Sequence, residues 1–168
     1  MVLLSDENGE EQGEDFLPLK VRDVMVREVI TVEEDSTVKE AVDIMNEFQI
    51  GSLIVLERGK AMGIVTERDF LRRVIAGAKD VADTKVKEIM TTPLVVVEPS
   101  TGLEEAVKLM LKSKIKKLAV VDANKLVGIV TLTDIARFQP QMMRMLKKLT
   151  AKQAAPKSMR KVIDYYIV

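Results

Sequence analysis

The chain has 168 residues, of which 47% are hydrophobic and 31% are charged, a balance typical of one globular domain with a buried core. It contains no cysteine and no histidine, which excludes a disulfide framework, a thiol nucleophile and the commonest metal ligand. Lys plus Arg and Asp plus Glu number 26 each, and no apolar run reaches the roughly 20 residues that span a bilayer, so we expect a cytoplasmic protein without a membrane partner.

Charge is distributed unevenly along the chain. Residues 1–16 hold six acids and no base, and we expect them to form a disordered acidic leader. From Arg137 to the C-terminus eight bases face a single acid, and residues 140–168 are expected to form a basic helix and tail. Between these segments, residues 17–78 and 79–139 are expected to form the two halves of one domain.

The two halves are copies of one pattern. Residues 21–73, moved forward by 65 positions, align with residues 86–138 without a gap and are identical at 18 of 53 positions. An internal repeat indicates that one supersecondary unit was built twice and that each copy covers the hydrophobic face of the other. The sequence therefore predicts two related sites rather than one.

Each copy has the same order of predicted elements: a helical turn, a short strand, a helix with apolar residues every three or four positions, two strands joined by a turn, and a second helix. The expected ranges are 21–25, 29–32, 38–48, 52–56, 61–66 and 67–76 in the first copy, and 86–90, 94–97, 103–111, 118–121 and 126–131, followed by a helix, in the second. Thr101 and Glu104 fit a capping box at the first helix of the second copy. We therefore predict a mixed α+β fold, in which two β-α-β-β-α repeats pack sheet to sheet with pseudo-twofold symmetry.

The closest match between the copies is a strand that ends in Gly-Ile-Val-Thr, followed by a helix with Asp in its first turn. Thr66 and Asp69 in the first copy correspond to Thr131 and Asp134 in the second. Thr at the N-cap with an acid three residues later is typical of a capping box, which accounts for each pair locally. The same pair suits a nucleoside phosphate, because a helix N-terminus attracts phosphate and an aspartate can accept hydrogen bonds from both hydroxyls of a ribose.

These features resemble a tandem pair of CBS domains, named after cystathionine β-synthase and often called a Bateman module. The resemblance covers about residues 20–138 and rests on the doubled unit, the opening turns that end in Met25 and Met90, and the two G-[hydrophobic]-V-T-x-x-D segments. It implies a non-catalytic sensor that requires no cofactor and binds an adenosine ligand (AMP, ADP, ATP or S-adenosylmethionine) in clefts between the repeats. Such a module signals through its dimer geometry or a partner, so we expect an effector protein of unknown identity. Apolar residues on both faces of the predicted helices, such as Ile44 besides Val38 and Val42, favour a homodimer.

The resemblance also implies that each cleft takes residues from both repeats. Cleft 1 would consist of Thr31, Ile50, Gly51, Ser52, Thr131, Thr133 and Asp134. Cleft 2 would consist of Val96, Ile115, Lys116, Lys117, Thr66, Arg68 and Asp69. Because cleft 1 has small and hydroxyl-bearing residues where cleft 2 has a valine and two lysines, we expect cleft 1 to hold adenosine more tightly and cleft 2 to favour higher phosphate charge. Alternatively, the two lysines belong to a solvated loop.

Two other functions are compatible with the sequence. The basic tail, with Arg144, Lys147 and Lys148, could contact nucleic acid, with an adenosine ligand as modulator. An enzyme is less favoured, because no constellation pairs a nucleophile with a base.

Overall fold

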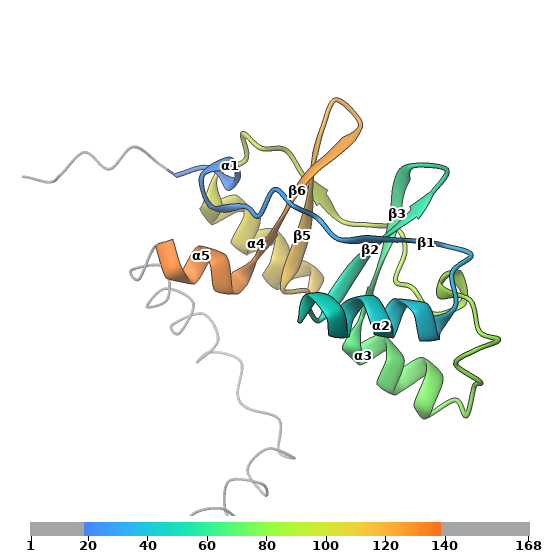
Figure 1. The fold of residues 1–168 in the computed structure, drawn as a ribbon. Helices are drawn as coiled ribbons and strands as arrows, with labels where there is room; N and C mark the ends of the chain where they lie inside the picture. Colours follow the sequence, from blue (N-terminus) through green and yellow to red (C-terminus); the bar gives the residue numbers. More distant parts are fainter. Residues whose placement is uncertain (1–18, 139–168) are drawn as a thin grey trace, which may run out of the picture.

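A computed structural model describes residues 19–138 of the chain (Figure 1). The expected acidic leader, residues 1–16, and the expected basic tail, residues 140–168, lie outside these described residues, as does the nucleic-acid contact assigned to the tail.

The described residues form two copies of one unit, which confirms the α+β fold of two β-α-β-β-α repeats. The first repeat contains α1 (Val21–Val24), β1 (Thr31–Glu33), α2 (Val38–Phe48), β2 (Ser52–Glu57), β3 (Lys60–Thr66) and α3 (Glu67–Asp69), which continues as a π-helical segment at Phe70–Ile75. The second contains a 3₁₀ turn (Val86–Glu88), β4 (Val96–Val97), α4 (Leu103–Ser113), β5 (Lys117–Asp122), β6 (Lys125–Thr131) and α5 (Leu132–Phe138).

The two three-stranded sheets have the same topology. Their strand orders are β1-β2-β3 and β4-β5-β6, with the first two strands parallel and the last two antiparallel in each. Because side chains alternate along a strand, Leu53 and Val55 point into the core of the first repeat, whereas Ile54, which is also fully buried, points to the other face. The two sheets lie against each other where β3 and β6 are in contact.

The opening turns are exchanged between the repeats. Val21 and Val24 of α1 are buried among the core residues of the second repeat, and α1 lies beside α4 in Figure 1. Val86 and Ile89, from the opening of the second repeat, are buried in the core of the first. Backbone hydrogen bonds fix both exchanges, from Val21 N to the Thr101 carbonyl (2.8 Å) and from Val86 N to the Ser36 carbonyl (2.9 Å). Each core is therefore completed by the other repeat.

The glycines of the two Gly-Ile-Val-Thr segments allow the exchanged chain to approach the sheet. A Cβ atom on Gly63 would lie 2.8 Å from the Thr91 carbonyl oxygen, and one on Gly128 would lie 2.7 Å from Sδ of Met25. At Gly63 the backbone leaves no room for a side chain, and at Gly128 a side chain would require Met25 to move and would lie only 3.1 Å from the Val26 carbonyl oxygen. These repeated glycines are thus explained by packing between the repeats.

The long helices begin differently in the two repeats. At α2, the Thr37 hydroxyl accepts a hydrogen bond from Glu40 N (3.1 Å) while Thr37 N donates to the Glu40 carboxylate (2.7 Å), a complete capping box. The capping box expected from Thr101 and Glu104 is wrong. Gly102 is the N-cap of α4, because the Thr101 hydroxyl accepts from Glu98 N (3.2 Å) in the preceding turn.

Candidate functional site

The two Thr–Asp pairs form the same hydrogen-bonded frame. Thr66 donates to Asp69 Oδ2 from its backbone N (2.9 Å) and its hydroxyl (2.7 Å). Thr131 donates to Asp134 Oδ2 in the same way, at 2.9 and 2.6 Å. Because the cap uses Oδ2 in both repeats, only Oδ1 of each aspartate is left to accept a hydrogen bond from a ligand.

Cleft 1 exists as a cavity of about 280 Å³ between the repeats. Its lining includes six of the seven residues that the sequence assigned to it: Ile50, Gly51, Ser52, Thr131, Thr133 and Asp134. The seventh, Thr31, lies in β1 opposite Ile54 and does not line the cavity, whereas its neighbours Val29 and Ile30 do. The structure therefore brings together residues from the second strand of one repeat and the Thr–Asp frame of the other.

The space above Gly51 is occupied by a carboxylate. A Cβ atom on Gly51 would lie 3.0 Å from Glu67 Oε2, and Glu67 N donates to the Gly51 carbonyl (3.3 Å). The start of α3 therefore packs against the strand that enters cleft 1, with the Glu67 carboxylate over Gly51.

Lys117, which the sequence assigned to cleft 2, lines the cleft 1 cavity. Its Nζ donates to the Ser52 hydroxyl at 2.9 Å, so two residues that are equivalent in the repeat, 65 positions apart, meet between the sheets. Burial lowers the pKa of Lys117, and the negative charges of Glu67 and Asp134 oppose that shift. This half-buried ammonium group is thus a cation available to an anionic ligand in cleft 1.

Arg137 is a second cation of the cavity that the cleft assignments did not include. It lies three residues after Asp134 on α5, and therefore on the same side of the helix. The signal was present in the sequence, because Arg137 and its counterpart Arg72 are among the identities shared by the repeats.

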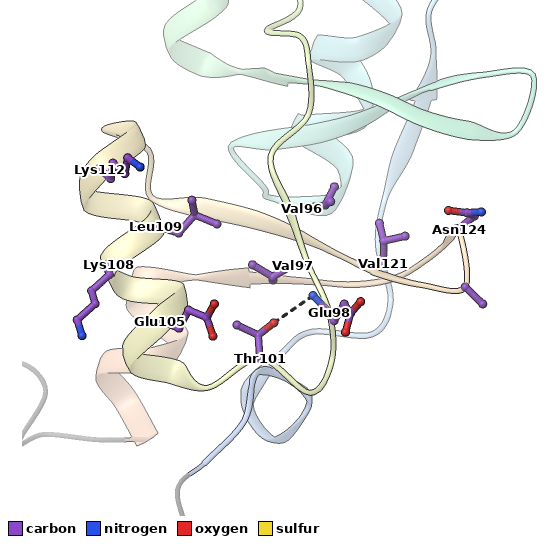
Figure 2. A pocket seen from close by; sticks show the side chains of 11 residues that line it. Val96, Val97, Glu98, Thr101, Glu105, Lys108, Leu109, Lys112, Val121 and Asn124 are labelled. Carbon is purple, nitrogen blue, oxygen red and sulfur yellow. Dashed lines mark hydrogen bonds between the residues drawn. The ribbon is translucent and has the colours of Figure 1, made fainter.

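The residues assigned to cleft 2 are not assembled in the same way. Val96 is 46% exposed and lines a different groove, of about 770 Å³, formed by α4, residues 96–98 and the end of β5 (Figure 2). Ile115 packs against the core of the second repeat, and Lys116 and Arg68 are exposed. The Lys116 carbonyl accepts a hydrogen bond from Leu132 N (2.9 Å), where α5 begins.

Asp69, the acid assigned to cleft 2, is engaged by neighbouring side chains. Only 9% of the residue is exposed. Its Oδ1 accepts a hydrogen bond from the Thr91 hydroxyl (3.3 Å) and lies 3.7 Å from Nε of Arg73. Asp134 is more exposed, and no donor within residues 19–138 is bound to its Oδ1. The two frames thus differ in what surrounds them.

Within residues 19–138, no helix has the length and apolar character needed to cross a bilayer, and no group of three or more acidic side chains is arranged to hold a metal ion.

Comparison with known proteins places both repeats in one family. The model of the CBS domain family matches residues 21–76 and 86–140. CBS domain-containing protein YhcV of Bacillus subtilis (strain 168) is 40% identical over 116 residues, which cover 69% of this chain and 82% of that protein.

Two solved structures show the same fold. The crystal structure of the CBS domain protein NE2398 has a TM-score of 0.68 and 31% identity, covering 71% of this chain and 96% of that one. The CBS domain pair of protein MJ0100, in complex with 5′-methylthioadenosine and S-adenosyl-L-methionine, has a TM-score of 0.66 and 27% identity, covering 73% of this chain and 96% of that one. With its two repeats, their three-stranded sheets and the paired Thr–Asp frames, this chain belongs to the CBS domain family as a tandem CBS pair.

Proposed function

We propose that the chain is a regulatory, non-catalytic module that binds an adenosine ligand in the cleft 1 cavity. The observation that carries the proposal is the position of Asp134. One carboxylate oxygen is held by the helix cap, and the residue lines a cavity whose opposite wall is Ile50, Gly51 and Ser52 of the other repeat.

The chemistry of the lining suits each part of such a ligand. Asp134 Oδ1 can accept hydrogen bonds from ribose hydroxyls, and the apolar Ile30 and Ile50 suit a purine face. Lys117 and Arg137 supply positive charge for phosphate or carboxylate groups. The volume of about 280 Å³ is close to the lower limit of small-molecule sites, roughly 300–1,000 Å³, and favours a single ligand whose nucleoside part fills the cavity.

The solved relative supports the chemical class but not the identity of the ligand. The CBS pair of protein MJ0100 was crystallised with two adenosine derivatives. The present chain shares its fold, and AMP, ADP, ATP and S-adenosylmethionine are all candidates for the cavity.

The output of the module is proposed to pass through a homodimer or an effector protein. The helices of the first repeat expose three large apolar side chains, Phe48 (50%), Leu71 (60%) and Ile75 (68%). At the positions 65 residues later, the sequence has Ser113, Ala136 and Pro140. The first repeat is therefore the better candidate for contact with a second copy.

Ligand binding can be tested with a thermal-shift panel of AMP, ADP, ATP and S-adenosylmethionine, followed by calorimetric titration. A ligand that binds the folded chain raises its melting temperature. We expect Asp134→Ala to weaken binding about a hundredfold, the cost of leaving the ribose hydroxyls without a charged acceptor.

Asp69→Ala is the matched control, because it removes the same capping interaction from the other repeat. It should leave binding intact. A panel without any melting shift, or a loss of binding with Asp69→Ala alone, would contradict the assignment of the ligand to cleft 1.

A further inference from the structure

Asp69 and Asp134 differ in the residues that lie beside Oδ1, the carboxylate oxygen that the helix cap does not use. Thr91 and Arg73 approach Asp69 Oδ1 in the first repeat. Counting back or forward by 65 positions, the equivalent residues near Asp134 are Val26 and Phe138, whose side chains have no hydrogen-bonding group. Both are exposed, at 46% and 59%. The two positions that supply Thr91 and Arg73 to Asp69 in the first repeat therefore supply no polar side chain to Asp134 in the second.

Arg73 is held in place by more than Asp69. Its Nη1 donates to the Ile89 carbonyl (2.7 Å) and to the Met90 carbonyl (2.6 Å). Both carbonyls belong to the exchanged opening segment, whose Ile89 side chain is fully buried in the core of the first repeat. We name Arg73, Thr91 and these two carbonyls the Arg73 clamp. The clamp joins Asp69 to a fixed part of the structure.

A ligand in cleft 2 would have to compete with this clamp. Its ribose hydroxyls would need Asp69 Oδ1, and taking it would break the Thr91 hydrogen bond and remove the carboxylate partner of Arg73. The ligand would replace these contacts at Asp69, but the Thr91 hydroxyl and the Arg73 guanidinium would be left without their carboxylate partner. Cleft 2 has also lost Lys117, whose ammonium group is bonded to Ser52 on the cleft 1 side.

We propose that Arg73 is a specificity-determining residue that closes cleft 2, so that each chain binds one adenosine ligand, at Asp134. The inference rests on the proposed function of cleft 1 and adds how many ligands bind and why. The sequence alone predicts a different outcome, in which cleft 2 also binds a ligand and favours one with a higher phosphate charge.

The experiment is calorimetric titration of the full chain with AMP, ADP, ATP and S-adenosylmethionine, comparing the number of ligands bound per chain. The unaltered chain should bind one. Arg73→Met combined with Thr91→Val should add a second, weaker binding event, and further substitution of Asp69→Ala should remove that event. Arg72→Met, which removes a charge from the exposed neighbouring residue, should leave the number at one.

A second variant tests the effect of the clamp side chains without altering the first repeat, by introducing them beside Asp134 in the second. Val26→Thr with Phe138→Arg places the two clamp side chains beside Asp134, at exposed positions that tolerate polar residues. Binding at cleft 1 should then fall at least tenfold, while melting without ligand changes little.

Two binding events in the unaltered chain would overturn the inference alone. The inference would also be overturned if the Arg73→Met, Thr91→Val variant still bound only one ligand and the Val26→Thr, Phe138→Arg variant kept the affinity of the unaltered chain. Absence of binding by the unaltered chain to all four compounds would overturn the proposed function, and the inference with it.

Discussion

The two Thr–Asp sites begin with the same hydrogen bonds and end in different surroundings. In both, Oδ2 accepts two hydrogen bonds from threonine, at 2.9 Å from the backbone N and at 2.7 or 2.6 Å from the hydroxyl. Beyond that frame, Asp69 is covered by side chains of its own protein, whereas Asp134 lines a cavity. A repeated motif therefore preserves local geometry, and the residues around it decide whether that geometry is open to a ligand.

The largest effect is expected where the repeats are alike, in the exchanged cores. Ile89→Ala removes a fully buried side chain from the core of the first repeat and should lower the free energy of unfolding by about 2–5 kcal/mol. Val81→Ala is the matched control, since Val81 is 42% exposed and lies outside both cores, and it should change stability by less than about 0.5 kcal/mol. Denaturant titration followed by circular dichroism measures both. Equal losses in the two variants would show that the exchanged segment is not part of the core.

The next largest effect is expected on ligand affinity when Lys117 is changed, because this cation lines cleft 1 rather than cleft 2. Lys117→Met should reduce ATP affinity about tenfold, equivalent to one charge-assisted hydrogen bond, and should affect adenosine much less. Lys116→Met is the matched control, because the neighbouring lysine is exposed. Titration calorimetry with both compounds distinguishes the positions. If Lys116→Met caused the larger loss, phosphate would be bound at cleft 2 as the sequence suggested.

Lys117 also gives a pH dependence in the chain without ligand. Burial lowers its pKa in the folded state, so the unfolded chain holds the proton more firmly and the charged form costs stability. This cost is present at neutral pH and disappears as the pH rises from the folded pKa toward the ordinary lysine value of about 10.4. Lys117→Met lacks the cost, so its stability relative to the unaltered chain should decrease over that alkaline range in denaturant titrations. A constant difference from neutral pH to the alkaline limit would contradict this origin.

The smallest expected effect lies at the starts of the long helices. Thr37→Ala removes the capping box of α2 and should cost about 1 kcal/mol in unfolding free energy. Gly102→Ser supplies a hydroxyl at the N-cap of α4, where a Cβ atom meets nothing within 4 Å, and should raise stability by only a few tenths of a kcal/mol. Thermal melting of both variants measures the asymmetry. Destabilisation by Gly102→Ser would mean that the backbone at this cap requires glycine.

Much of this organisation could be predicted from the sequence because the repeat has no gaps. The correspondence of Thr66 with Thr131 and of Asp69 with Asp134 was sufficient to place two frames, and six residues of cleft 1 line one cavity. Backbone position follows from such correspondences, since equivalent residues occupy equivalent places in two copies of one fold.

The parts that could not be predicted depend on where long side chains turn and on which carbonyls they reach. Lys117 has a flexible stem and lies between the sheets, so its position in the repeat does not decide which cleft receives its ammonium group. Arg73 donates hydrogen bonds to the carbonyls of Ile89 and Met90. Because every residue has a backbone carbonyl, the sequence does not indicate which ones a long side chain reaches. The exchange of opening turns was hidden for a related reason, because Val21 and Val24 correspond to Val86 and Ile89, and such similar residues do not indicate which core receives them.

That exchange determines the order in which the protein can be completed during its synthesis. The core of the first repeat closes once Val86 and Ile89 have been made, about midway along the chain. Val21 and Val24, among the first described residues to leave the ribosome, must wait for β6 and α5, which are the last described elements to follow. The earliest and latest described parts of the module therefore share one core, and a chain interrupted before α5 lacks Ile135 from the core in which Val21 and Val24 are buried.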